Sequence, residues 1–211
     1  NTPSTITTRE NTLSKGVYFR MIVFRKSGNN YVFQSAADYT SNGASSPVLK
    51  KGKLLTRSGT IRVIGYSFNT TAALGDIPAS YTYNTTKIDI PNMNNDFMTY
   101  DSGDIANVNS LNYNLPVIFK QKLCKLTISI SVTGFTSNTI SGCTGVYVKQ
   151  GGNSTSWVIG SSAVAANTSN TASFNPNTNQ TTTIHMVPFA SSRTITVHFN
   201  KLTVGNLIAN N

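Results

Sequence analysis

The residues that could perform acid–base or metal chemistry are few and widely spaced. The chain contains seven acidic residues and two histidines, His185 and His198. Catalysis needs a convergent set of titratable groups, and the sequence has neither a G-x-S-x-G nucleophile motif nor a glycine-rich phosphate loop. His185 stands between Ile184 and Met186, which indicates an outward-facing residue on a strand, and no spacing offers a third metal ligand. We therefore expect no catalytic, cofactor-binding or metal-binding residues, although a carboxylate pair for glycoside hydrolysis stays open.

Two other polar groups have both a chemical and a structural interpretation. The stretch 101–104 (Asp-Ser-Gly-Asp) resembles a fragment of a calcium loop, but ligands at fixed alternate positions are missing, which favours a plain surface loop. Cys124 and Cys143 would lie opposite each other in a hairpin that turns near residues 133–134, and a disulfide could then form. The alternative, which we favour, is two small buried thiols.

The charge of the chain is strongly basic, with 17 Lys and Arg against 7 acids and a formal net charge of +10. The basic residues form no block, and there is no zinc-finger spacing or RNA-binding aromatic signature. We interpret the charge as a scarcity of acids and expect no nucleic-acid partner. No run of 18 apolar residues is present, so no transmembrane segment is expected either. The polar start at Asn1 is compatible with a cytosolic chain or with an exported protein whose leader was removed, and the Thr-, Ser- and Asn-rich composition suits the exported protein better.

The elements that must position these residues are predicted to be strands. Charged residues are 11% of the chain against about 25% in average soluble proteins, and Glu10 is the one glutamate, which argues against helical bundles. The apolar run Gly16–Phe24 predicts a strand buried on both faces, followed by a hairpin at residues 28–30. Alternation from Cys124 to Val132 predicts a strand with one wet face. Further strands are expected at 60–67, 87–90, 145–149, 156–159, 182–187 and 194–199, the last two as a hairpin, with a strand or a helical turn at 96–100.

The fold that follows is all-β, with two antiparallel β-sandwich domains and no helix longer than three turns. We place the domain boundary in the polar stretch around residues 109–114. The domains are then residues 1–114 and 115–211, each near the usual domain size.

The order of the apolar phrases is similar to that of the fimbrillin-like family of Bacteroidales. The phrases that carry the likeness are Leu13–Phe24, Ile61–Asn69 and Val117–Ile130, within residues 13–135. Gln121 stands where the family often has histidine. The resemblance implies a second domain of transthyretin-like fold and a type V pilus subunit that is made as a lipoprotein precursor, exported to the outer membrane and assembled extracellularly with other pilus subunits by strand exchange. The P-G-x-x-Y phrase of the family's last strand is missing, so we expect the C-terminus to be short or truncated.

The resemblance also implies which residues take part in strand exchange. Cleavage after Arg9 would remove a terminal strand formed by residues 2–8. The alternative is that this segment is an ordinary frayed terminus. The groove opened in this way is predicted to be lined by Val17, Phe19 and Met21. The donor strand of the next subunit is predicted to contain Leu202, Val204, Leu207 and Ile208.

Two further functions remain open beside a structural, non-enzymatic pilus subunit or adhesin. The first is an extracellular β-sandwich that binds carbohydrate or a host protein, for which Trp157 is the one candidate for stacking on a sugar. A single tryptophan is more often a core residue, and we favour that interpretation. The second is a secreted hydrolase.

Overall fold

The computed structural model describes residues 10–11, 13–43, 45–91, 95–108, 115–129, 131, 133–134, 140–144, 147–149, 155–165, 172–173, 181–188, 196–198, 201–205 and 207–210. In these residues the protein is all-β, without a helix, and every strand pair with a described register is antiparallel. The described part of the chain thus offers no helix that could cross a membrane.

The chain divides into two compact units, which we describe separately. The first unit is Asn1–Ile88, Asn95–Lys122 and Ser156–Ala163, and the second is Asp89–Asn94, Leu123–Thr155 and Val164–Asn211. This division assigns residues 115–122 and 156–163 to the first unit, whereas the predicted boundary places them in the second domain.

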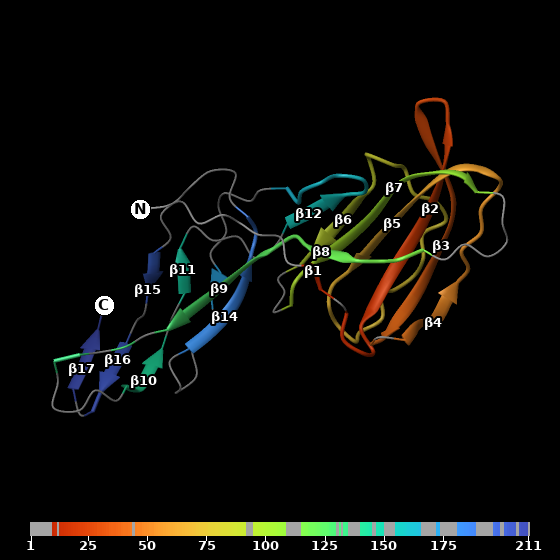
Figure 1. Cartoon of the computed structure of the whole chain (residues 1–211). Helices are drawn as coiled ribbons and strands as arrows, with labels where there is room; N and C mark the ends of the chain where they lie inside the picture. Colours follow the sequence, from red (N-terminus) through yellow and green to blue (C-terminus); the bar gives the residue numbers. More distant parts are fainter. Residues whose placement is uncertain are drawn as a thin grey trace. The chain divides into compact units, whose positions relative to one another are not determined.

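The first unit is built on a seven-stranded sheet (Figure 1) with the order β1-β8-β7-β5-β2-β3-β4. β1 and β4 form its two edges. The strands in this order are β1 (Glu10–Asn11), β8 (Phe119–Gln121), β7 (Met98–Val108), β5 (Gly59–Ser67), β2 (Tyr18–Ser27), β3 (Asn30–Asn42) and β4 (Ser45–Gly52).

The central strand β2 confirms the prediction of a strand buried on both faces. Its residues 19–24 are all buried, because β2 lies between β3 and β5 and both faces of the sheet are covered. The hairpin to β3 is also confirmed, with Ser27 opposite Asn30 across residues 28–29. One face carries a core cluster of apolar side chains from the strands and from the segment before β2. It consists of Leu13, Val17, Phe19, Met21, Val23, Ile61, Val63, Met98, Tyr100, Val108 and Phe119.

The opposite face of the sheet holds a buried ion pair. Arg20 of β2 donates from Nε to Asp38 of β3 over 2.6 Å and from NH2 to the other carboxylate oxygen over 2.8 Å, and both side chains are at most 4% exposed. The same guanidinium donates to the Tyr81 hydroxyl and to the carbonyls of Gly75 and Asp76 over 3.0–3.1 Å. All five N–H groups of Arg20 are therefore satisfied, and the segment 75–81 is tied to the sheet.

The second unit contains short antiparallel strands. One three-stranded sheet has the order β10-β16-β17, another the order β13-β11-β15, and β9 pairs with β14. Their bounds are β9 (Cys124–Ser129), β10 (Ile140–Thr144), β11 (Tyr147–Lys149), β13 (Ala172–Ser173), β14 (Thr181–Met186), β15 (Thr196–His198), β16 (Lys201–Val204) and β17 (Leu207–Asn210). Half-buried and exposed residues alternate strictly along β9, which confirms its predicted wet face. The remaining sheet pairs β6 (Lys87–Ile90) with β12 (Thr155–Val158).

The hairpin predicted for 182–187 and 194–199 is wrong, and so is the hairpin considered as the condition for a disulfide, because the strands pair with other segments. The strands predicted at 182–187 and 194–199 form β14 and β15, which pair with β9 and β11 rather than with each other. Likewise β9 and β10 are not neighbours: Cys124 stands opposite Met186, and Cys143 stands opposite Leu202. Apolar alternation is satisfied by any partner that covers the same face, so it predicts a strand without predicting its neighbour.

Candidate functional site

The most weakly held edge of the large sheet is formed by β8 and β1. Among the described residues β1 is Glu10–Asn11, and it pairs with β8 alone, with Glu10 opposite Lys120 and Asn11 opposite Phe119. β8 is itself only three residues long. A short strand at a sheet edge has few backbone hydrogen bonds to hold it, so this edge can open at a small cost in free energy.

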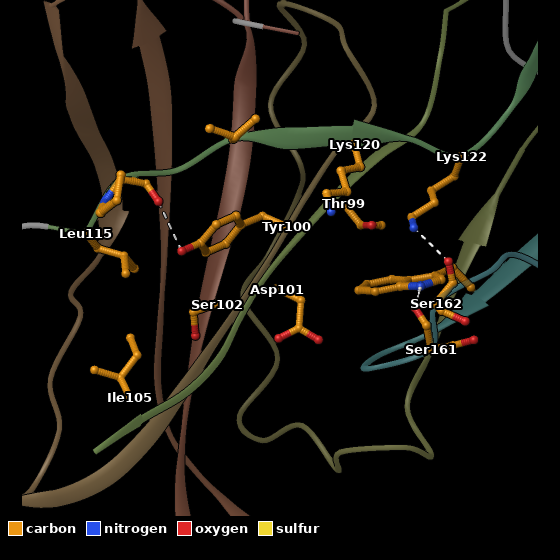
Figure 2. A pocket seen from close by; sticks show the side chains of 13 residues that line it. Thr99, Tyr100, Asp101, Ser102, Ile105, Leu115, Lys120, Lys122, Ser161 and Ser162 are labelled. Atoms are coloured by element: carbon orange, nitrogen blue, oxygen red, sulfur yellow. Dashed lines mark hydrogen bonds between the residues drawn. The ribbon is translucent and has the colours of Figure 1, made fainter. Parts of the chain in front are cut away.

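An open cleft of about 600 Å³ lies where β8 separates from β7. β7 is paired with β5 as far as Val108, but its described register with β8 ends at Thr99. Beyond that point a side chain bridges the gap, since the Tyr100 hydroxyl donates to the Pro116 carbonyl over 3.1 Å (Figure 2). The lining residues are Thr99, Tyr100, Asp101, Ser102, Ile105, Leu115, Pro116, Ile118, Lys120, Lys122, Trp157, Ser161 and Ser162. All of them belong to the first unit.

Two lysines give the cleft a positive end. Lys120 and Lys122 are two positions apart on an extended chain, so both side chains lie on one face, and Figure 2 shows both directed into the cleft. The half-buried Lys122 ammonium donates to the Ser162 carbonyl over 2.7 Å. Burial, and secondarily the charge of Lys120, lower the pKa of Lys122 below its ordinary value. The described residues show no ion pair at either lysine. An incoming carboxylate would therefore relieve the repulsion between the two ammonium groups.

Trp157 lies beside this cleft but is a core residue, which confirms the favoured interpretation. Its side chain is only 2% exposed, and its indole N–H donates to the Ser161 carbonyl over 2.9 Å. The ring packs against Phe97 and Tyr66, with centroids 5.8 and 6.4 Å away. With both the ring and its N–H engaged in the protein, Trp157 offers no free face for stacking on a sugar.

The acidic residues of the suggested calcium-loop fragment are engaged in cross-strand ion pairs. Asp101 accepts two hydrogen bonds from Arg62, over 2.8 and 2.6 Å. Asp104 accepts hydrogen bonds from Lys26 over 2.6 Å and from the Tyr31 hydroxyl, and these two donors, Lys26 first, lower the pKa of Asp104. The stretch is part of β7 and connects it to β2, β3 and β5.

The residues of the predicted exchange groove are buried together in the core cluster. Val17, Phe19 and Met21 are at most 6% exposed, and β2 is paired on both sides, so they do not border a free backbone edge. The connection to the edge is made by Phe119 of β8, whose ring contacts that of Phe19 edge-on at 5.4 Å. Arg9 and the segment 2–8 lie outside the described residues.

The predicted donor tail is divided between two strands. Leu202 and Val204 are buried in β16, which is paired on both sides with β10 and β17. Leu207 and Ile208 belong to β17, which in the described part of the chain pairs only with β16. Only β17 therefore has the free side that a donor strand needs.

The prediction from sequence omitted Lys120 and Lys122, although the signal was present. The two lysines flank Gln121 within the phrase Val117–Ile130, and an extended chain there places them on one face. What the spacing could not reveal is that the described pairing of β8 with β7 stops at Thr99 and leaves a cleft beside the two lysines. No family model, curated protein or solved structure matches the chain, so the function must be argued from this geometry.

Proposed function

We propose that the protein is a structural, non-enzymatic subunit or adhesin of a cell-surface pilus, exported as a lipoprotein precursor and assembled with other pilus subunits by β-strand exchange. In this proposal both units are β-sandwiches, the second transthyretin-like, and the protein works outside the cell without a cofactor. The supporting resemblance is to the fimbrillin-like family.

The observation that carries the proposal is the two-residue strand β1 at the edge of the large sheet. The described part of β1, Glu10–Asn11, directly follows the proposed cleavage site at Arg9. Cleavage there would leave a two-residue strand at a new chain end, and chain ends held by so few contacts fray. Loss of β1 would make β8 the sheet edge and uncover Phe119, which contacts Phe19. An incoming strand would restore the backbone hydrogen bonds and cover the apolar residues.

The donor in this proposal is β17 of the next subunit. β17 ends the β10-β16-β17 sheet and pairs only through Leu207–Asn210, so its release breaks one short ladder. Leu202 and Val204 would stay in β16, which narrows the predicted donor to Leu207 and Ile208.

The carbohydrate-binding alternative loses its aromatic platform, because Trp157 is buried. Binding of a host protein or glycan by an assembled pilus would remain compatible with the proposal.

Limited trypsin digestion of the full chain, followed by size-exclusion chromatography, tests the proposal. We expect a cut after Arg9 and the appearance of oligomers. The variant Arg9→Gln should stay monomeric under the same digestion, which controls for cuts at the exposed Lys53 and Arg57. Added peptide 201–211 should cap the oligomers and shorten them. A chain that is cut after Arg9 and stays monomeric, even with this peptide in large excess, would exclude strand exchange.

A further inference from the structure

We infer that the β8 edge and its cleft bind an extended strand that carries a carboxylate opposite Lys120, so that the partner is an acidic strand of another protein. This inference rests on the proposed function for the opening of the edge. It adds the chemistry of the strand that the edge accepts.

The first observation is the register of β1. The chain's one glutamate, Glu10, stands opposite Lys120 in the β1–β8 pair. Side chains at opposite positions of an antiparallel pair have Cβ atoms about 4.5–5.5 Å apart, where opposite charges stabilise the pairing. A strand that replaces β1 in the same register, with a carboxylate at this position, would place that carboxylate opposite Lys120.

The second observation is the environment of the Lys122 ammonium group. Its ammonium group is half-buried and bonded to the neutral Ser162 carbonyl, and its charge is repelled by Lys120. The nearby Asp101 is already bound to Arg62 through both carboxylate oxygens. A carboxylate placed between the two lysines would form hydrogen bonds in which both donor and acceptor are charged, whereas in the existing bond only the lysine is charged.

The third observation is the apolar wall of the same cleft. Ile118 is 50% exposed, and Leu115 is partly buried on the same segment before β8. An extended peptide has alternating side chains that can contact this wall while its backbone pairs with β8. A small free anion would bind the two lysines but leave Ile118 and Leu115 uncovered. A positive end beside an apolar wall therefore favours an extended strand as the ligand.

The charge distribution of the chain favours another protein as the source of this strand. All seven acidic residues lie at or before Asp104, so the segment 105–211, including β17, contains no Asp or Glu. A second copy's tail can therefore pair with the β8 edge but cannot neutralise Lys120 and Lys122. Under the proposed function, the pilus partner that binds most tightly here is a different subunit with an acidic donor strand.

Binding of fluorescently labelled peptides to the full chain tests the inference by anisotropy. The probe is a synthetic peptide with the sequence of residues 7–14, which includes Glu10, and its matched control has Glu10→Gln. We expect the control to bind about tenfold more weakly, since a hydrogen bond to a charged group contributes about 1.5 kcal/mol. Binding of the Glu10 peptide should weaken when NaCl is raised from about 50 to 500 mM, because salt screens the charges.

Protein variants locate the binding at the β8 edge. Lys122→Met and Lys120→Gln should each remove most of the preference for the Glu10 peptide. Lys53→Met, which removes an equal charge near the opposite edge of the sheet, should leave it unchanged, and circular dichroism verifies folding of all three. Equal binding of the two peptides, or an equal loss with Lys53→Met, would overturn the inference.

Competition by an acidic oligogalacturonide with the same dependence on Lys120 and Lys122 would assign the cleft to an acidic glycan instead. Failure of the peptide test with successful oligomer formation after cleavage would reject this inference alone and leave strand exchange standing.

Discussion

At the scale of single residues, charge is used in two different ways in the first unit. Arg20 and Asp38 neutralise each other inside the protein, and every donor of the guanidinium has an acceptor. Lys120 and Lys122 line an open cleft, and the side chains described there form no ion pair with either lysine, although Glu10 stands opposite Lys120 in the strand register. A fully bonded buried pair stabilises one structure, whereas uncompensated charges at a cleft are available to a ligand.

The substitution Asp38→Asn should destabilise the protein strongly. It leaves the Arg20 guanidinium buried without a counter-charge, and breaking a buried pair in this way costs about 3–5 kcal/mol in the free energy of unfolding. Urea unfolding followed by fluorescence measures the loss. The control Asp76→Asn removes a carboxylate that is 98% exposed and should change the free energy of unfolding far less. Similar losses in the two variants would show that the buried pair has no special role.

At the scale of elements, the two ends of the large sheet differ in how firmly they are held. β4 is eight residues long and stands opposite β3 at five positions, and its chain carries Pro47, Lys50 and Lys51, which hinder further strands from adding. At the other end, the described part of β1 is Glu10–Asn11, and it pairs with the three-residue strand β8. The protected edge and the weakly held edge explain why strand exchange is proposed at β8 and not at β4.

The glycine that ends β4 should be far less tolerant of alanine than a glycine in an open loop. Gly52 and Gly75 both have positive φ angles, 73° and 77°, so alanine costs each about 1–2 kcal/mol in backbone strain. A Cβ at Gly52 would also collide with the Ala36 carbonyl oxygen and lie 2.8 Å from Ile77, whereas at Gly75 it meets open space. We expect Gly52→Ala to lose about 1–3 kcal/mol more than Gly75→Ala in urea unfolding. Equal losses of unfolding free energy in the two variants would show that β3 and β4 are not tightly packed around Gly52.

At the scale of the whole molecule, the dominant property is a net charge of +10. Like-charged copies repel each other at distances up to the Debye length, which is about 10 Å at 0.1 M salt. Charge repulsion therefore opposes self-association of this chain, whereas charge attraction assists its association with an acidic partner.

These two kinds of association should respond to salt in opposite directions. Oligomer formation by the Arg9-cleaved chain should become faster when NaCl is raised from about 20 to 200 mM, because repulsion between basic copies is screened. Light scattering during digestion, corrected for the cleavage rate by electrophoresis, measures this. Slower oligomer formation at higher salt would indicate that attraction between opposite charges of two copies drives the contact.

The sequence by itself determined the class of the fold and the position of its clearest strands. The run around Phe19–Phe24 predicted a strand buried on both faces, and the alternation from Cys124 predicted a strand with one wet face. Such patterns are reliable because the side-chain period of a strand is a property of the local backbone.

The tertiary structure alone decided the strand partners and the candidate site. It paired β9 with β14 and β10 with β16, it buried Trp157, and it left Lys120 and Lys122 at a cleft where β8 separates from β7. Periodicity records which face of a strand is covered but not by which segment, since any apolar face of the right length can cover another. A cleft depends on where pairing stops between segments distant in the chain, and that is settled only when the whole sheet has formed.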